Sequence, residues 1–145
     1  MGPKVLYFED AHEDDEAPTL VTPQITRTHI VRYAGASGDF NPIHTDEICA
    51  IRAGNDRVFA MGMMTAGFLS HMITDWLGNG TLRKYGIRFV ARVWPGDTIT
   101  CKGRIVEKYT DGKRKFIKAD VHAENQNAQK VITGSILAEL PSRNE

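Results

Sequence analysis

The chain has 145 residues, with 18 acidic and 18 basic side chains, so its formal net charge is zero. This length suits one domain with its own core, and a hydrophobic content of 41% is ordinary for a soluble globular protein. No apolar run approaches the roughly 18 residues of a membrane span, and the apolar part of the N-terminus is too short for a signal peptide. We therefore expect a cytoplasmic protein without a membrane partner.

The first part of the chain differs in charge from the rest. Residues 1–18 include six acids between positions 9 and 16, which leaves 17 basic and 12 acidic residues elsewhere. This segment has no periodicity, so we expect a mobile or loosely docked N-terminal arm, with docking across the basic body as the alternative. Residues 19–141 are expected to form the single folded domain, and residues 142–145 a polar tail.

Short elements are predicted next. Residues 19–24 are prone to form a strand, but Pro23 confines such a strand to the edge of a sheet. A helix with Thr26 or Thr28 as its N-cap is predicted over residues 26–34, with Gly35 as its stop. A second, shorter helix, capped by Thr45 or Asp46, is predicted over residues 46–53.

A long apolar helix and a run of strands are predicted to follow. Residues 59–77 are mostly apolar or small, which is typical of a helix surrounded by protein. Alternating apolar and polar residues then predict four strands, near 84–93, 99–109, 117–123 and 132–138. This order favours an α+β fold in which a curved antiparallel sheet wraps around the helix, although other sheet-and-helix arrangements fit the pattern. Open strand edges also favour a dimer.

The most informative stretch lies before the long helix and ends at His44. Gly38 can take a positive φ angle, and Pro42 pushes Asn41 out of the helical region, so a bent, non-helical loop is expected. Such a loop can aim Asp39 and His44 into one space, where they can share acid and base work on one water molecule. Taken singly, each has an ordinary interpretation, as a turn aspartate and a helix-start histidine. Cys49 and Cys101 are interpreted as reduced thiols.

Two motifs resemble a known family. Residues 37–44, Ser-Gly-Asp-Phe-Asn-Pro-Ile-His, resemble the signature of the MaoC-like dehydratases, also called R-specific enoyl-CoA hydratases or hydratase 2. Residues 60–67, Ala-Met-Gly-Met-Met-Thr-Ala-Gly, resemble the start of that family's central helix. The pattern over residues 26–97 is similar to small acyl dehydratase subunits. The resemblance implies a hot-dog fold and reversible hydration of a trans-2-enoyl thioester to an R-3-hydroxyacyl thioester.

The resemblance also implies roles for single residues. Asp39 would deprotonate the attacking water, while His44 would orient it and help to move the proton. The N–H of Gly62, at the start of the long helix, would receive the negative charge on the thioester oxygen. Gly62 has an equally good interpretation as a small residue that permits close packing. Many family members have histidine at the position of Met61, which neither titrates nor donates a good hydrogen bond.

Asn41 and Ser70 are weaker candidates for substrate binding. Asn41 either touches substrate or braces the loop, and bracing is the simpler reading. Ser70 falls where related hydratases place a serine that lines the site, but a serine on a buried helix often bonds its own backbone.

No cofactor is expected, and no metal, because Asp39, His44 and Asp46 lack a third strong ligand at a known spacing. The expected substrate is an acyl-CoA or acyl-carrier thioester, and the basic excess suits these anions as well as it suits solvated strand faces. Nucleic acid fits poorly because no basic stripe is interleaved with aromatics. The expected assembly is a homodimer or higher homo-oligomer, with a heterodimer also open. Alternative functions are a hot-dog acyl-CoA thioesterase and a partner subunit of a heteromeric acyl dehydratase.

Overall fold

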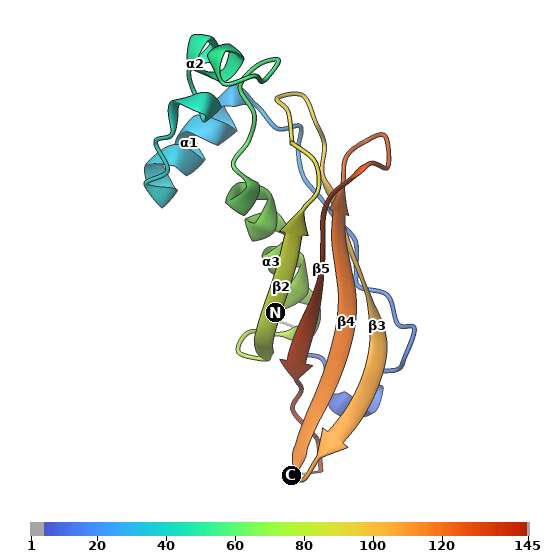
Figure 1. Ribbon diagram of the computed structural model, residues 1–145. Coiled ribbons are helices and arrows are strands. Elements are labelled where there is room, and N and C mark those ends of the chain that lie inside the picture. The colour runs from blue at the N-terminus through green and yellow to red at the C-terminus, as the bar shows by residue number, and fades with distance from the viewer. Residues whose placement is uncertain (1–4, 145) are drawn as a thin grey trace.

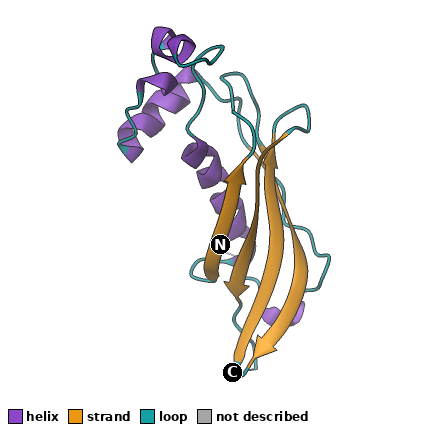
Figure 2. Cartoon of the chain, viewed as in Figure 1, coloured by secondary structure: helices purple, strands orange, loops and turns teal. Residues whose placement is uncertain are grey.

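The structure, a computed structural model, describes residues 5–144 (Figure 1). Within these residues the helices are α1 (Arg27–Ser37), α2 (Glu47–Arg52) and α3 (Gly62–Leu77), with short 3-10 helices at Phe8–Asp10 and Pro42–His44. The strands are β1 (Leu20–Val21), β2 (Leu82–Phe89), β3 (Thr100–Asp111), β4 (Arg114–Glu124) and β5 (Lys130–Glu139). The curved sheet lies against α3, while α1 and α2 extend beyond one end of the sheet (Figure 2).

The sheet is antiparallel throughout and has the strand order β1-β3-β4-β5-β2. Residues that face α3 are paired across neighbouring strands, so that Val121 lies opposite Gly103 on one side and Gly134 on the other. The order leaves β1 and β2 at the two edges. A curved antiparallel sheet packed on one long helix confirms the α+β hot-dog fold that the sequence and its family resemblance predicted.

Helix α3 provides the centre of the core. Its side chains Leu69, Ile73 and Leu77 are fully buried, as expected for an apolar helix. Residues 5–144 leave the opposite side of α3 uncovered, as the 59% exposure of Met63 shows. The phenol of Tyr85 on β2 donates a hydrogen bond of 2.9 Å to the carbonyl of Ala66, which ties the helix to the edge strand. Burial raises the pKa of that phenol to about 12.

Three predicted element boundaries were wrong, the first being the start of the long helix, which lies at Gly62 and not at residue 59. Helix α1 does not stop at Gly35 but continues to Ser37, because Gly38 is the residue that takes the left-handed conformation (φ 74°). The strand predicted over 84–93 ends at Phe89 instead. The N–H groups of Val90 and Ala91 both point to the carbonyl of Val131, so regular pairing stops and the chain leaves the sheet.

The N-terminal segment lies against the sheet over residues 5–18, the part that the structure describes. Its backbone bonds to the sheet, with the N–H of Ala17 donating to the carbonyl of Gly103 at 2.8 Å. Its acids face basic partners, since Asp14 pairs with Arg104 at 2.8 Å. The charge difference between arm and body therefore acts within the chain. The predicted arm also includes residues 1–4 and the predicted tail includes residue 145, which lie outside the described residues.

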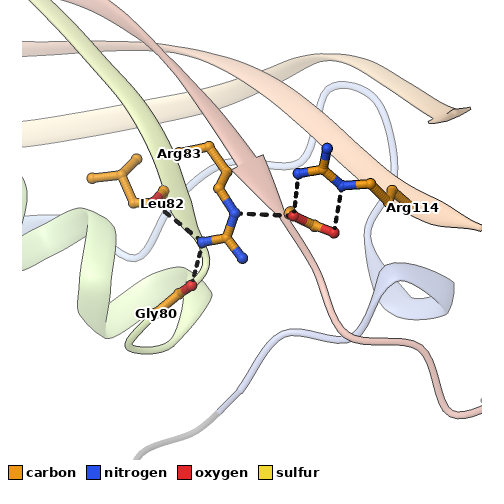
Figure 3. Close-up of polar contacts among 5 residues, drawn as sticks. Gly80, Leu82, Arg83 and Arg114 are labelled. Atoms are coloured by element: carbon orange, nitrogen blue, oxygen red, sulfur yellow. Dashed lines mark hydrogen bonds and ion pairs between the residues drawn. The ribbon is translucent and has the colours of Figure 1, made fainter.

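One carboxylate links the last strand to its neighbours at the end of the sheet far from α1 and α2. Glu139 on β5 accepts hydrogen bonds from Arg83 of β2 (2.9 Å) and from Arg114 of β4 (2.8 and 3.0 Å) (Figure 3). Arg83 is oriented by a further bond to the carbonyl of Gly80. The bonds from Arg114 first, and from Arg83 second, lower the pKa of Glu139 to about 2. Glu139 is therefore held as a carboxylate over the whole physiological pH range.

Candidate functional site

The Asp39 loop is bent by its own short-range hydrogen bonds. The hydroxyl of Ser37 donates to the carbonyl of Tyr33 at 2.7 Å and accepts the N–H of Asp39 at 3.2 Å. Gly38 then turns the chain, and Asn41 takes the non-helical conformation expected before a proline (φ −59°, ψ 120°). The expected bend is therefore present, and it begins at Gly38, directly after α1.

Asp39 and His44 face each other across this bend. The Oδ2 atom of Asp39 lies 3.9 Å from the Nε2 atom of His44. This separation is too long for a direct hydrogen bond. The side chain of Asp39 is 44% exposed, whereas that of His44 is 9% exposed. The pair therefore combines a buried imidazole with a carboxylate that solvent or a ligand can reach.

Phe59 fixes the orientation of the imidazole in two ways. Its carbonyl lies 2.7 Å from Nδ1 of His44, a distance that assigns the proton to Nδ1 as donor. Its ring meets the imidazole edge to face, with ring centroids 4.8 Å apart. With Nδ1 donating to a carbonyl, Nε2 of neutral His44 is an acceptor that points toward Asp39.

A cleft of about 480 Å³ opens at the N-terminal end of α3. It is bounded by the Asp39 loop, the start of α3, the segment after β2 and the start of β5, and its lining includes Asp39, Phe59, Met61, Gly62, Phe89 and Arg92. Most of this lining is apolar, with Asp39 and Arg92 as its charged residues, and His44 faces Asp39 without itself lining the cleft. Such an arrangement suits a ligand with an apolar chain and a polar reacting group.

Gly62 meets two requirements at once. It is the first residue of α3, Met61 before it supplies no side-chain cap, and its N–H precedes the first bond of the helix, from the N–H of Met64 to the carbonyl of Met61 at 3.1 Å. A Cβ atom at Gly62 would lie 2.8 Å from Cε1 of Phe89. Both interpretations of Gly62 from the sequence, as a donor to an oxyanion and as a close-packing residue, therefore have a geometric basis.

The remaining predicted residues differ in whether they line the cleft: Met61 does, whereas Asn41 and Ser70 do not. Asn41 braces the loop, because its side-chain oxygen accepts the N–H of Ile43 at 3.3 Å and its own N–H donates to Asp39 at 3.2 Å. The Ser70 hydroxyl donates to the carbonyl of Gly67 in the same helix at 2.9 Å, and Ser70 is not among the residues that line the cleft. Met61 is 2% exposed and lines the cleft with its neighbours.

Asp46 has a structural role in α2. Its carboxylate accepts the N–H groups of Cys49 and Ile48, and these backbone bonds lower the pKa of Asp46. In the described part of the chain, no three acidic, histidine or cysteine side chains are grouped closely enough to hold a metal ion.

The sequence interpretation missed two contributors to the site. Phe59 acts partly through its backbone carbonyl, which any residue type carries, so composition offers no signal for it. Arg92 was interpreted as part of the polar face of a strand, whereas it lines the cleft because β2 ends three residues earlier.

Comparisons with known proteins show which family the chain resembles. Residues 10–127 match the family described as "MaoC like domain". A 3-hydroxybutyryl-CoA dehydratase from Methylorubrum extorquens is 28% identical over 144 residues, which cover 98% of this chain and 88% of that protein. An (R)-specific enoyl-CoA hydratase from Rhodospirillum rubrum is 36% identical over 96 residues, covering 65% of each chain.

The structural likeness extends over nearly the whole chain. The R-hydratase PhaJ1 from Pseudomonas aeruginosa superposes with a TM-score of 0.81 at 21% identity, covering 94% of this chain and 86% of that one. Some relatives are far longer, since the chain spans 6% of a fatty acid synthase subunit beta from Aspergillus oryzae. With the matched region covering most of its residues, the chain belongs to the MaoC-like dehydratase family.

Proposed function

We propose that the protein adds water reversibly across the double bond of a trans-2-enoyl thioester to give an R-3-hydroxyacyl thioester. The observation that carries this proposal is the placement of Asp39, which lines a mostly apolar cleft, opposite Nε2 of His44. Family membership and the names of the two relatives, a 3-hydroxybutyryl-CoA dehydratase and an (R)-specific enoyl-CoA hydratase, support it.

In this reaction the carboxylate of Asp39 accepts a proton from the water that attacks the β-carbon. Neutral His44 accepts a hydrogen bond from the same water through Nε2, because the carbonyl of Phe59 selects the tautomer with its proton on Nδ1. The hydroxyl group adds to the β-carbon, and the proton taken up by Asp39 passes to the α-carbon. A 3.9 Å separation suits two groups that both contact one oxygen atom between them.

Negative charge develops on the thioester oxygen during this addition. The N–H of Gly62 lines the same cleft at the N-terminus of a 16-residue helix, whose dipole favours negative charge there. We infer that this N–H donates a hydrogen bond to the thioester oxygen. A single preorganised donor of this kind is worth about 3 to 4 kcal/mol in other enzymes.

The direct test replaces each member of the pair. We expect Asp39→Asn and His44→Ala to lower the hydration rate by about 10²- to 10⁴-fold, because each removes a group that transfers or orients the proton. The rate is measured as the loss of absorbance of an enoyl-CoA. The chain offers a matched control in His71 and Asp75, an exposed pair 3.2 Å apart on α3, so His71→Ala and Asp75→Asn should retain activity.

Two results would contradict the assignment. An Asp39→Asn variant as active as the unmodified protein would remove the carboxylate from the mechanism. Release of free thiol from a saturated acyl-CoA, followed with a thiol-reactive dye, would instead indicate a thioesterase.

We also propose that the active protein is a homodimer. Strand β2 lies at a sheet edge, and the apolar side chains of Met63, Phe89 and Val90, which line the cleft, are 59%, 50% and 48% exposed. Such an edge with adjoining apolar surface favours pairing with a second copy.

The homodimer is tested by light scattering, which should give twice the mass of one chain. The Val90→Asp variant should shift the measured mass toward that of a single chain. A monomeric unmodified protein, or activity only with a different co-purified chain, would argue against a homodimer.

None of the helices in residues 5–144 is both long and apolar enough to cross a membrane. The cytoplasmic location remains a prediction from the sequence. Fractionation of cells that produce the protein would check it.

A further inference from the structure

Arg92 is an exposed cation that lines the cleft and that the proposed reaction does not use. It lines the same cleft as Asp39, and its guanidinium carbon lies 5.2 Å from the centre of the Phe59 ring. None of the ion pairs among residues 5–144 includes Arg92. By contrast, the described arginines outside the cleft region include several that are each bound to a carboxylate, namely Arg83, Arg104, Arg114 and Arg143.

A second cation adds to the positive charge on this side of the cleft. The Trp94 ring meets the Phe59 ring at 6.0 Å, and the guanidinium of Arg57 lies 5.5 Å from the centre of the Trp94 ring. The charge of Arg57 lowers the pKa of Glu47, but the carboxylate of Glu47 is already bonded to Arg27 at 2.5 Å. Arg27 is the main cause of its lowered pKa, and Arg57 is a minor one. Arg57, like Arg92, takes part in none of the ion pairs in the described part of the chain.

The position of the guanidinium favours an anionic partner. A guanidinium that lies over an aromatic ring is held by cation–π attraction, which leaves its N–H donors available at the edges. Phosphate accepts such donors in pairs, and the contact is strong because both groups are charged. A cleft with apolar walls strengthens the attraction further.

Resting on the proposed function, we propose that Arg92 binds a phosphate group of the thioester carrier. The chemistry is shared by two carriers, because coenzyme A and the prosthetic arm of an acyl carrier protein both contain a 4′-phosphopantetheine unit. Coenzyme A has additional phosphates on its nucleotide. In this arrangement the acyl chain enters the apolar part of the cleft, the thioester lies between Asp39 and Gly62, and the phosphate lies at Arg92.

The experiment compares substrates that differ only in their phosphates. Crotonyl-CoA, crotonyl-4′-phosphopantetheine and crotonyl-pantetheine, which has no phosphate, are each hydrated by the unmodified protein, by Arg92→Gln and by Arg92→Lys. We expect Arg92→Gln to raise KM for crotonyl-CoA about tenfold with little change in kcat, because a bond to a charged group is lost. KM for crotonyl-pantetheine should not change. Arg92→Lys should recover part of the affinity, since it restores charge without the planar fork.

Arg88 provides a matched control. It lies four residues earlier, is exposed and is absent from the cleft lining, so Arg88→Gln should leave all three KM values unchanged. An Arg92 effect with crotonyl-4′-phosphopantetheine equal to that with crotonyl-CoA would assign the contact to the phosphate common to both carriers. An effect with crotonyl-CoA alone would assign it to the nucleotide phosphates.

The result that overturns the proposal is an equal rise in KM for crotonyl-pantetheine. Arg92 would then act by packing on Phe59 and so by positioning His44. Failure of the proposed reaction is distinguishable, because calorimetric binding of coenzyme A to the unmodified protein and to Arg92→Gln needs no turnover. Equal affinity in that measurement would also overturn the proposal.

Discussion

At the scale of single residues, Gly62 has two possible roles, as an N–H donor and as a residue without a side chain. Substitutions at positions 62 and 89 can separate these roles. Gly62→Ala keeps the backbone N–H but adds a Cβ atom that would lie 2.8 Å from Cε1 of Phe89. Phe89 is 50% exposed, so its ring can move aside, and we expect a stability loss of about 1 kcal/mol, at the low end for overpacking. We also expect a lower kcat, because the displaced ring and helix start disturb the cleft. Urea unfolding and the hydration assay measure the two effects.

A double variant decides which role matters for catalysis. Gly62→Ala with Phe89→Ala removes the overlap and keeps the N–H, so activity should return to that of Phe89→Ala alone if the N–H is the functional group. A double variant that stays as slow as Gly62→Ala would show that position 62 itself must be free of a side chain.

At the scale of elements, the pairing of β5 with β2 depends on a glycine. A Cβ atom at Gly134 would lie 2.3 Å from the carbonyl oxygen of Gly86 and 3.1 Å from Cα of Ile87. These are backbone atoms in a paired strand, which cannot move aside as a side chain can. We expect Gly134→Ala to cost about 1 to 3 kcal/mol or more of unfolding free energy, measured by urea denaturation.

The neighbouring strand supplies the comparison for that measurement. A Cβ atom at Gly86 would approach only the carbonyl oxygen of Ser135, at 3.9 Å, which is an ordinary contact. Gly86→Ala should therefore change stability much less than Gly134→Ala. Equal losses in the two variants would mean that glycine is needed for flexibility and not for the close approach of the strands.

At the scale of the whole molecule, acid should loosen contacts between segments that are far apart in sequence. Glu139 has its pKa lowered from 4.5 to about 2 by Arg114 and Arg83, so the folded state favours its ionised form. This contribution to stability is full above pH 4.5 and is lost as the pH falls toward 2. Glu9 behaves in the same way, with its pKa lowered to about 2 chiefly by the hydroxyl of Ser142. The docked arm and the sheet end should weaken together.

The measurement is thermal unfolding over that pH range. Glu139→Gln should lower the melting temperature near neutral pH and make the acid-induced decrease shallower, because one titrating group is gone. Glu107, which pairs with Lys118 on the exposed sheet surface, gives a matched control, and Glu107→Gln should keep the original slope. An unchanged slope in Glu139→Gln would show that this carboxylate does not govern the acid response.

The sequence by itself determined the features that depend on neighbours in the chain. Thr26 and Asp46 cap their helices as short-range patterns indicate, and Pro42 holds Asn41 in the extended region. The motif from Ser37 to His44 was long enough to indicate the family and hence the fold. It also singled out the two groups that face each other at 3.9 Å.

Only the tertiary structure decided the contacts between residues that are far apart along the chain. The carbonyl of Phe59 selects the proton position on His44, the ring of Phe89 occupies the space beside Gly62, and Arg92 enters the cleft because β2 ends early. The docking of the acidic arm likewise depends on which basic residues the sheet brings beneath it. Local patterns fix backbone conformation through bonds a few residues long. These packing and charge contacts exist only after the sheet has closed around the helix.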